Sequence, residues 1–454
     1  MKNRIRSTLI KRIGYLVLLL LQGFSFAFLW YSYYVPLMQE RNRDFYFWGN
    51  IAVVALYMLF IVFFTKSFDG YKYAILRNKN TCFSNMLAVT FSNIVGNIQI
   101  WAVGSQYFSV VPMVILTIVQ WIFVVIVIST MRFLSLKVLK PEEILLIYGS
   151  FPPDELLEKA SKIQDKLLIK KVLNIDAGME VLKAEIMNYS AVLLCDLDSE
   201  KRNQILKFCY HHKKKVYITP KITDIIVSSG EVLPFFDTPL LRINESGLSV
   251  ESQILKRAFD LIISLSAIII LSPLMLFLAM LIKLQDGGKV FYMQERLTKG
   301  GKSFYIIKFR SMRENSEVEG ARLATCDDDR ITSVGRIMRA THLDELPQIF
   351  NIIKGEMSLV GPRPERQEIM EEYEKSIPEF RYRLTVKAGL TGYAQIYGKY
   401  NTSPYDKLRL DLKYIETYSL WLDIKLLFLT FKIMFQRDNT EGVKENQKTA
   451  MKDD

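Results

Sequence analysis

Histidine and cysteine are scarce in this chain, with three histidines and four cysteines among 454 residues. The cysteines form no CxxC pair and are scattered over different segments: Cys82, Cys195, Cys209 and Cys326. This spacing gives no evidence for a disulfide or a zinc site and is typical of reduced thiols in a cytoplasmic setting. Two of the histidines, His211 and His212, are adjacent beside a lysine run, as at a solvated helix end. Any chemistry must therefore proceed mostly without imidazole.

The chain is also poor in polar residues for an ordinary soluble protein of its size. Half of its residues are hydrophobic and its mean hydropathy is +0.14, so part of it must lie in lipid. The net charge of +12 is spread along the sequence rather than gathered in one basic tail. Such a charge favours an anionic partner, either a membrane surface or a phosphorylated substrate. The apolar content argues against nucleic acid as that partner.

Four apolar windows are each near the ~20 residues that a helix needs to cross the hydrocarbon core of a bilayer. They cover residues 13–37, 45–65, 83–103 and 108–131. Lysine and arginine precede the first window, separate the second from the third and follow the fourth, which makes both ends cytoplasmic by the positive-inside rule. The first window is too long for a signal-peptide core and lacks an evident cleavage site, so we interpret it as a retained helix. We predict a transmembrane four-helix bundle over residues 1–135.

Short apolar runs alternate with charged, helix-period stretches over residues 140–245. The runs EILLIYG, KKVLNI, AVLLCDL and KKVYITP are typical of buried strands, and helices are expected after Pro153, Asp176, Asp198 and Thr223. This alternation predicts a parallel sheet covered on its faces, in a Rossmann-like α/β domain. The first strand-to-helix turn, YGSFPPDE, lacks the GxGxxG spacing that lets a backbone approach a pyrophosphate. These residues fit a structural or regulatory module better than a nucleotide site.

A long apolar run, AFDLIISLSAIIILSPLMLFLAMLIKL, covers residues 258–284 and follows Lys256 and Arg257. It is long enough to span a bilayer, but Ser272 and Pro273 fall at its middle. Proline there removes a backbone hydrogen bond and kinks the helix. Both flanks are cationic, which favours a re-entrant helix that returns to the cytoplasmic face. The alternative is a fifth spanning helix that tolerates the proline.

A second apolar stretch near the C-terminus, LWLDIKLLFLTFKIMF, covers residues 420–435 and mixes large apolar side chains with Asp423, Lys425 and Lys432. This composition is consistent with an interfacial helix that deepens the membrane anchorage. A core-packing helix is the equal alternative.

Polar motifs follow one another over residues 286–438, namely QER, KFRSM, DDDRIT, LDELPQ, SLVGPRP and AGLTGYAQIYG. Together they supply carboxylates, guanidiniums and glycine turns, an inventory that suits phosphate chemistry. The cations expected to bind phosphate or nucleotide are Arg296, Lys308, Arg310, Arg330 and Arg363. Each of these arginines could equally form a surface or structural ion pair.

Asp344 and Glu345 stand side by side ahead of LPQIFNIIKG, with Pro347 in the opening turn and Gly355 at the close. Acidic residues in this place cap orphan amides and complement the helix dipole. The chemical alternative is that one carboxylate attacks phosphorus, because it is ionised at neutral pH and needs no histidine to take a proton. Bound Mg²⁺ and nearby arginines would then screen this anion from an anionic diphosphate. The local pattern leaves both explanations open.

The ordered series KRAFD, the apolar run broken by Ser-Pro, QER, KFRSM, DDDRIT, LDELPQIFNIIKGEMSLVGPRP and GLTGYAQIYG resembles the catalytic domain of the bacterial sugar transferases, the monotopic polyprenyl-phosphate glycosyl-1-phosphate transferases. The resemblance covers residues 253–437, and LDELPQ and VGPRP are its most specific motifs. The preceding segments resemble the large form of this family. The implied architecture is an N-terminal four-helix transmembrane bundle, a central Rossmann-like domain, a C-terminal α-rich monotopic catalytic domain with a re-entrant helix, and a polar tail at 438–454.

The resemblance implies an enzyme that transfers a sugar 1-phosphate, expected to be a hexose 1-phosphate, from a UDP-sugar to a polyprenyl phosphate, usually undecaprenyl phosphate. UMP would be released, and the product would start an exopolysaccharide, capsule or O-antigen on the cytoplasmic face of the bacterial inner membrane. Asp344 would be the nucleophile that forms a phosphosugar-aspartyl intermediate, Glu345 would assist through the metal or the acceptor, and the dyad would bind Mg²⁺.

Two other functions remain as alternatives to this transferase. One is a non-catalytic membrane scaffold or regulator of polysaccharide assembly, and the other is a UDP-sugar hydrolase that uses Asp344 with water as the acceptor. The N-terminal spans also offer packing surface for a homo-oligomer.

Overall fold

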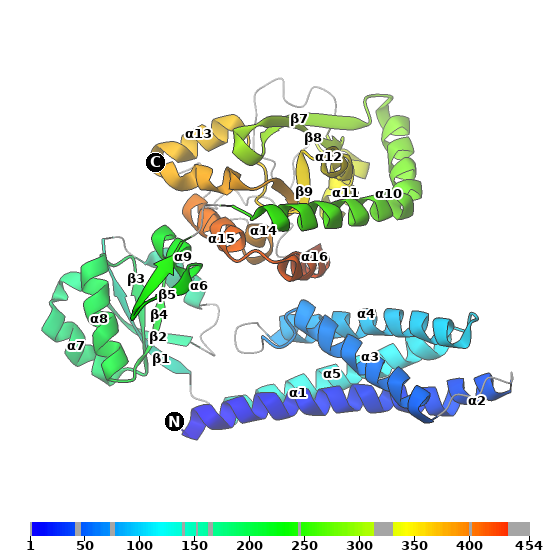
Figure 1. The fold of residues 1–454 in the computed structure, drawn as a ribbon, viewed down its shortest axis with the longest axis horizontal. Coiled ribbons are helices and arrows are strands. Elements are labelled where there is room, and N and C mark those ends of the chain that lie inside the picture. The colour runs from blue at the N-terminus through cyan, green and yellow to red at the C-terminus, as the bar shows by residue number, and fades with distance from the viewer. Residues whose placement is uncertain are drawn as a thin grey trace. The chain divides into compact units, whose positions relative to one another are not determined.

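The computed structural model of the chain describes residues 2–40, 47–72, 78–138, 141–150, 153–161, 167–243, 247–312, 330–398 and 402–434. The chain divides into two compact units, Met1–Thr219 and Pro220–Asp454. The first unit contains the N-terminal helices and a four-stranded sheet, and the second contains all the candidate site residues (Figure 1). The predicted tail at 438–454 and the acidic run at 327–329 lie outside the described residues.

Long apolar helices make up the N-terminal part of the first unit. They are α1 (Lys2–Leu29), continued by a π-helical turn (Trp30–Tyr34) and α2 (Val35–Gln39), then α3 (Phe47–Ser67), α4 (Asn78–Gly104) and α5 (Val111–Val138). α1 packs against α3 and α5, and α4 also packs against both. These helices are long and apolar enough to cross a membrane. The protein is therefore a membrane protein, as the sequence predicted.

Asn93, a polar residue of the third predicted span, lies between helices. Its side chain accepts a hydrogen bond from the Tyr57 hydroxyl on α3 at 2.6 Å and donates to Gln120 on α5 at 2.9 Å. Gln120 also donates to the backbone carbonyl of Gln22 on α1 at 3.1 Å. All four of these residues are buried. Because an unpaired polar group is costly in hydrocarbon, mutual bonding allows a helix with amide side chains to pack within the bundle.

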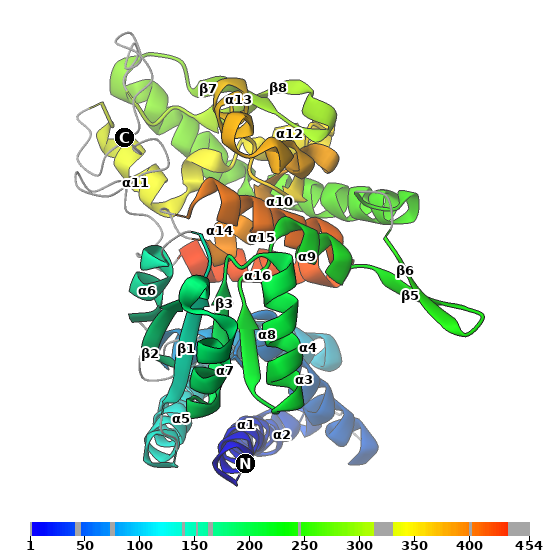
Figure 2. The ribbon, with the colours of Figure 1, turned by 90° about the vertical axis from the view of Figure 1, so that its left-hand side faces the viewer.

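A parallel sheet follows, with the strand order β2-β1-β3-β4. Its strands are β1 (Glu142–Tyr148), β2 (Leu167–Asn174), β3 (Ala191–Cys195) and β4 (Lys215–Ile218), and its helices are α6 (Asp154–Ser161), α7 (Met179–Asn188) and α8 (Ser199–His211). α7 and α8 pack their apolar sides against the sheet (Figure 2). The prediction of a parallel-sheet α/β domain is confirmed, and all four predicted strands form.

Gly149 ends β1 in a turn that packs closely on the end of β3. Its amide donates to the Cys195 carbonyl at 3.1 Å, and a Cβ at position 149 would lie 2.0 Å from the Asp196 carbonyl oxygen. The absence of a side chain thus permits close packing of two strand ends. The Gly149 amide is used inside the domain rather than offered to a pyrophosphate, in keeping with the missing GxGxxG spacing.

The helix expected after Thr223 belongs to the second unit. This helix, α9 (Ile222–Ser228), buries Ile222 and Ile225 in the hydrophobic core of that unit. A hairpin of β5 (Glu231–Phe235) and β6 (Thr238–Arg242) follows and projects from the unit (Figure 2). The change of compact unit at 219–220 thus falls within the segment 140–245 that we predicted as one domain.

The long helix α10 (Val250–Asp286) contains Pro273 and bends partway along its length (Figure 1). Pro273 has no amide hydrogen, so the carbonyl of Ile269, four residues earlier, loses its helical partner. The hydroxyl of Ser272 donates to this carbonyl at 3.1 Å instead. Pro273 thus removes one backbone hydrogen bond, and the hydroxyl of Ser272 supplies another to the same carbonyl. This replacement stabilises a bent helix in an apolar surrounding. By length and composition α10 is also able to cross a membrane.

The second unit continues with short strands and helices. In chain order they are β7 (Phe291–Leu297), a 3-10 turn (Lys299–Gly301), β8 (Ser303–Phe309), α11 (Ser333–Thr341), a 3-10 turn (Leu343–Glu345), α12 (Gln348–Lys354), β9 (Met357–Val360), α13 (Gln367–Ser376), a 3-10 segment (Pro378–Thr385), β10 (Ala388–Thr391), α14 (Tyr393–Tyr397), α15 (Pro404–Glu416) and α16 (Leu420–Met434). β7 pairs antiparallel with β8, and β9 pairs parallel with β10.

α16 packs into the hydrophobic core of the second unit. Leu426 and Leu429 belong to this core together with Val360 of β9 and Leu408 of α15. Asp423 is fully buried as well. Of the two explanations for residues 420–435, the core-packing helix is therefore the one that the contacts favour.

Candidate active site

A sharp turn between two helices presents the Asp-Glu dyad. α11 ends at Thr341, His342 adopts a left-handed conformation with φ 57°, and Leu343–Glu345 form a single 3-10 turn. This conformation is unfavourable for a residue with a β-carbon, and such residues gather at functional sites. The Glu345 amide donates to the His342 carbonyl at 3.2 Å, which closes the turn. The dyad is thus fixed by backbone bonds rather than carried on an extended loop.

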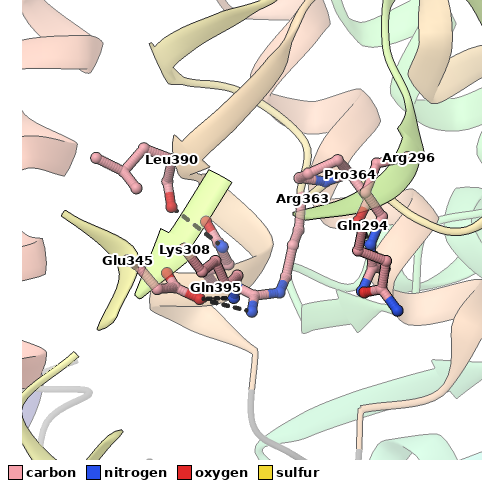
Figure 3. A network of polar contacts seen from close by, with 8 residues as sticks. All are labelled: Gln294, Arg296, Lys308, Glu345, Arg363, Pro364, Leu390 and Gln395. Carbon is pink, nitrogen blue, oxygen red and sulfur yellow. Dashed lines mark hydrogen bonds and ion pairs between the residues drawn. The ribbon is translucent and has the colours of Figure 1, made fainter. Parts of the chain in front are cut away.

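Glu345 is held by two cations from separate elements (Figure 3). Lys308 on β8 places its Nζ 2.6 Å from Glu345 Oε1, and Arg363, which follows β9, places its Nη2 3.1 Å from the same oxygen. The Glu345 side chain is 14% exposed. Burial alone would raise the pKa of its carboxyl group, but the charges and hydrogen bonds of Arg363 and Lys308 hold that pKa well below its usual range. Glu345 is therefore an ionised carboxylate at physiological pH.

Asp344 stands in a different environment from its neighbour. Within the described part of the chain, its carboxylate forms no hydrogen bond or ion pair with another side chain. Burial raises the pKa of Asp344, the charge of Lys308 lowers it in part, and the Glu345 carboxylate raises it further. Two adjacent carboxyl groups thus have pKa values that are pushed in opposite directions, a pattern that marks groups with different roles. Asp344 is the carboxylate whose oxygens these cations leave open to a reacting atom.

The described structure does not use the dyad as a helix cap. α12 begins after Pro347 with no side-chain hydrogen bond at its N-terminus, and it ends at Gly355, whose φ of 90° is left-handed. The proline and glycine at the two ends of the helix thus act as the sequence predicted. Glu345 instead contacts Lys308 and Arg363, so capping does not account for this side chain in the described structure.

Asn351 fixes β8, which carries Lys308, to α12, which follows the dyad. This fully buried side chain accepts a hydrogen bond from the Ile307 amide at 3.0 Å and donates to the Tyr305 carbonyl at 2.7 Å. Since β8 pairs with β7 along only one edge, its other edge has backbone groups that need partners. The amide of Asn351 supplies those partners as a neighbouring strand would.

The position of Arg363 is set by its backbone. The buried Arg383 donates from Nη2 to the Arg363 carbonyl at 3.1 Å, and Asp411 balances the Arg383 charge at 2.8 Å. Gly361, two residues before Arg363, lies so close to β10 that a Cβ would be 2.4 Å from the Lys387 carbonyl oxygen. The VGPRP motif thus needs its glycine for the close approach of two strands, and this approach places Arg363.

Arg296 on β7 lies beside the loop that carries Arg363 and does not bond Glu345 (Figure 3). Its Nη2 donates to Gln294 at 2.6 Å and its Nη1 donates to the Pro364 carbonyl at 3.3 Å. Burial lowers the pKa of this arginine, against the influence of Glu365. Arg296 therefore braces the loop rather than the dyad.

Arg310 and Arg330 are the remaining predicted cations. Arg310 follows β8 and forms an ion pair with Asp286 at the end of α10. Arg330 lies in the turn that leads to an isolated bridge between Ile331 and Met312. Of the five predicted cations, the described contacts bring Lys308 and Arg363 onto Glu345 and use Arg310 to join β8 to α10.

Three residues that support the site were not singled out from the sequence: Asn351, Arg383 and Arg257. Arg257 on α10 donates to the carbonyls of Ile352 and Ile353, at 2.6 and 2.8 Å, and so caps the C-terminal end of α12. The sequence predicted Arg257 as part of a cationic membrane flank and of the KRAFD motif, without indicating this contact. A lone asparagine inside the apolar run IFNII was the one sequence signal for a buried, bonded amide.

The dyad is also the candidate metal site. Over the described residues, no group of three or more His, Cys, Asp or Glu side chains is placed to hold a metal ion. Magnesium is often bound by one or two carboxylates and completes its shell with water and substrate phosphates. Both cations of Glu345 contact its Oε1. The carboxylate oxygens of Asp344 and Glu345 thus fit Mg²⁺ when a phosphorylated ligand supplies further oxygens.

Comparison with known proteins places the site within a recognised segment. Residues 251–437 match the family model described as "Bacterial sugar transferase". One relative is the "UDP-N-acetylgalactosamine-undecaprenyl-phosphate N-acetylgalactosaminephosphotransferase" of Aeromonas hydrophila, to which the chain is 44% identical over 181 residues. These residues are 39% of this chain and 43% of that protein.

Two further relatives match over longer stretches at lower identity. The "Undecaprenyl-phosphate galactose phosphotransferase" of Salmonella typhimurium is 37% identical over 246 residues, which are 50% of this chain and 51% of that protein. The "UDP-glucose:undecaprenyl-phosphate glucose-1-phosphate transferase" of Escherichia coli is 39% identical over 204 residues, which are 44% of this chain and 42% of that protein. The chain thus matches about half the length of these relatives.

Proposed function

We propose that the protein transfers a sugar 1-phosphate from a UDP-sugar to undecaprenyl phosphate and releases UMP, because residues 251–437 match the family model of the bacterial sugar transferases. The names of the three relatives agree on undecaprenyl phosphate as the acceptor, but the sugar is N-acetylgalactosamine, galactose or glucose. The proposal therefore names the reaction and the acceptor, and the sugar is to be measured. The lipid-linked product would begin an exopolysaccharide, capsule or O-antigen.

The contrast between Asp344 and Glu345 is the observation that carries this proposal. Glu345 is neutralised by Lys308 and Arg363, whereas Asp344 is partly buried and forms no hydrogen bond or ion pair with either cation. A carboxylate that is desolvated and unpaired is a stronger nucleophile than one held in an ion pair. Asp344 is accordingly the nucleophile of the proposed reaction, and Glu345 holds the surrounding charges in place.

In the first step an oxygen of the Asp344 carboxylate attacks the phosphorus that bears the sugar. A bond forms between these two atoms, the bond from phosphorus to the bridging oxygen breaks, and UMP leaves with the electron pair. In the second step an oxygen of undecaprenyl phosphate attacks the same phosphorus, and Asp344 leaves as a carboxylate. Both nucleophiles are already anions, so neither step needs a strong base. This suits a chain with three histidines.

Positive charge at the site offsets the repulsion between these anions and the diphosphate. Lys308 and Arg363 are within hydrogen-bond distance of Glu345, so a diphosphate bound beside the dyad would share their donors. Asp344 and Glu345 would hold Mg²⁺ together with phosphate oxygens, and the bound ion would neutralise charge on the departing phosphate.

The proposed reaction takes place at the cytoplasmic face of the bacterial inner membrane. In this arrangement α1, α3, α4 and α5 are four spanning helices, and α10 is a re-entrant helix bent near Ser272 and Pro273. Apolar side chains are highly exposed before and after this pair, as at Ile269 and Leu276, which are 75% and 72% exposed. A UDP-sugar is water-soluble and the acceptor has its head group at the interface, so the dyad must be held at membrane level.

Release of UMP by the purified full-length protein in detergent tests the proposal. A panel of UDP-sugars is supplied with Mg²⁺, with and without undecaprenyl phosphate. We expect release that requires both the lipid phosphate and one particular UDP-sugar. Release without the lipid would identify a UDP-sugar hydrolase instead. A folded protein that releases no UMP from any sugar would contradict the transferase and favour a scaffold.

A further inference from the structure

Cations gather at the C-terminal end of α12, at the opposite end of the helix from the dyad. Arg257 on α10 and Lys387, just before β10, converge on Gly355. A Cβ at this glycine would lie 3.4 Å from Arg257 Nη2 and 3.6 Å from Lys387 Nζ. Lys299, from the turn between β7 and β8, donates from Nζ to Gln253 on α10, one turn before Arg257, at 2.9 Å, and its charge lowers the pKa of Lys387. The seven residues of α12 separate this cluster from the dyad, which is ~10 Å of helix.

Positive charge is in excess in this cluster. Lys387 forms no hydrogen bond or ion pair with its side chain within the described residues. Burial lowers the pKa of Lys387, and the charges of Arg257 and Lys299 lower it further, while Asp260 opposes them in part. Asp260 is itself engaged, because its Oδ1 accepts a hydrogen bond from the Leu359 amide at 3.2 Å. The charged form of a half-buried lysine among like charges is unfavourable, and a bound anion would stabilise it.

The cluster lies beside an apolar surface at the start of α10. Val250, Ile254 and Leu255, within two turns of Arg257, are 67%, 66% and 54% exposed. Exposed apolar side chains next to cations are typical of the boundary between lipid head groups and acyl chains. The anion present at that depth of a bilayer is the phosphate of a lipid, and arginine and lysine are its usual partners.

We propose that Arg257, Lys299 and Lys387 bind the phosphate group of an anionic bilayer lipid, at a site separate from the dyad. The phosphate would lie over Gly355, at the position without a side chain that faces Arg257 Nη2 and Lys387 Nζ, and it would share Nη2 with the Ile353 carbonyl. The bound lipid would seat the second unit at the membrane surface. This site does not depend on sugar transfer, so its test requires no turnover and can fail while the proposed function stands.

Thermal unfolding of the full-length protein in detergent measures such binding, because a ligand that binds only the folded state raises Tm. The added compounds are short-chain phosphatidylglycerol, short-chain phosphatidylcholine, farnesyl phosphate and inorganic phosphate. We expect phosphatidylglycerol to raise Tm by several degrees and the other three to give much smaller shifts. Lys387→Gln should abolish the shift and Lys387→Arg should retain it. Lys375→Gln is the matched control, because this lysine on α13 is 72% exposed.

Other results would overturn the proposal in distinguishable ways. An equal phosphatidylglycerol shift in the wild type and in Lys387→Gln would show that the lipid does not bind this cluster. An equal shift with inorganic phosphate would assign the site to a free phosphate, and a shift confined to farnesyl phosphate would assign it to the acceptor. Should Lys387→Gln fail to fold, Lys299→Gln tests the same cluster from an exposed position and should reduce the shift.

Discussion

The side-chain amide of Asn351 accepts a hydrogen bond from the backbone amide of Ile307, one residue before Lys308, at 3.0 Å. This bond fixes the register of β8 against the helix that follows the dyad. A shift of one residue along β8 would turn the Lys308 side chain to the other face of the strand, away from Glu345. The ion pair at the dyad is therefore set by a neutral amide that touches neither charged group.

Replacement of Asn351 by leucine should damage both stability and turnover. The change keeps the size of the side chain but leaves the Ile307 amide and the Tyr305 carbonyl unpaired, at a cost of about 1–3 kcal/mol each. Misplacement of Lys308 should lower kcat by roughly 10- to 100-fold. Thermal unfolding and UMP release measure the two effects. Unchanged turnover in a destabilised variant would show that Asn351 has a structural role only.

Asp344→Asn should abolish sugar transfer while leaving the fold intact. The amide has the same shape but cannot form the bond to phosphorus, so UMP release should fall by roughly three orders of magnitude or more. Because Asp344 is a partly buried carboxylate without a bonded partner, the unfolding temperature should stay the same or rise. Glu372→Gln, at a surface position on α13 with 67% exposure, is the control. Near-normal release by Asp344→Asn would rule out this residue as the nucleophile.

The acid limb of the pH profile should report Asp344. This residue must be ionised to attack, and burial raises its pKa, so kcat should fall as the pH drops through that raised value. The charge of Lys308 lowers the pKa of Asp344 and the charge of Glu345 raises it. Lys308→Met should therefore move the limb to higher pH, and Glu345→Gln should move it to lower pH.

Profiles of kcat against pH for the wild type and these two variants provide the measurement. Displacements of both variants in the same direction would contradict the assignment of the limb to Asp344, since the two substitutions remove charges of opposite sign. Both substitutions should lower the rate, so a sensitive assay of released UMP is needed to record a full profile for each variant.

The bend of α10 predicts where the end of this helix lies. In a protein without its native cysteines, Gln285→Cys near the end of α10 should react with a membrane-impermeant thiol reagent only from the cytoplasmic side. Adding Pro273→Leu restores the backbone hydrogen bond to Ile269 and should straighten the helix, so that labelling from the outside appears. Asn203→Cys, an exposed position on α8, which precedes α10 in the chain, is the reference for the cytoplasmic side. Outside labelling of Gln285→Cys with Pro273 present would mean that α10 spans the bilayer.

Elements with a strong local pattern were predictable from the sequence. α3 and α5 are long apolar runs, and β1 and β3 are the short apolar runs expected of strands buried in a parallel sheet. The position of α12 followed from Pro347 and Gly355 at its ends. The dyad was found because its carboxylates stand next to each other in the chain, so no knowledge of the fold was needed to bring them together.

The partners of the dyad were not predictable, because they come from distant segments. Lys308 is 37 residues from Glu345 and Arg363 is 18 residues from it. Arg310 stands two positions from Lys308 in the same motif, yet it pairs with Asp286. Which of these cations faces the dyad depends on the alternation of side chains along β8 and on the place where the strand ends. Composition and motif order carry no information on either.

The bonds from Arg257 to the carbonyls of Ile352 and Ile353 give α12 a mechanical role. One end of this short helix is fastened to α10, and the other end leads directly to the dyad. A tilt of α10 would therefore be transmitted through α12 to the turn that carries Asp344 and Glu345. The thickness and lateral pressure of the surrounding bilayer would then influence kcat, the rate at saturating substrate.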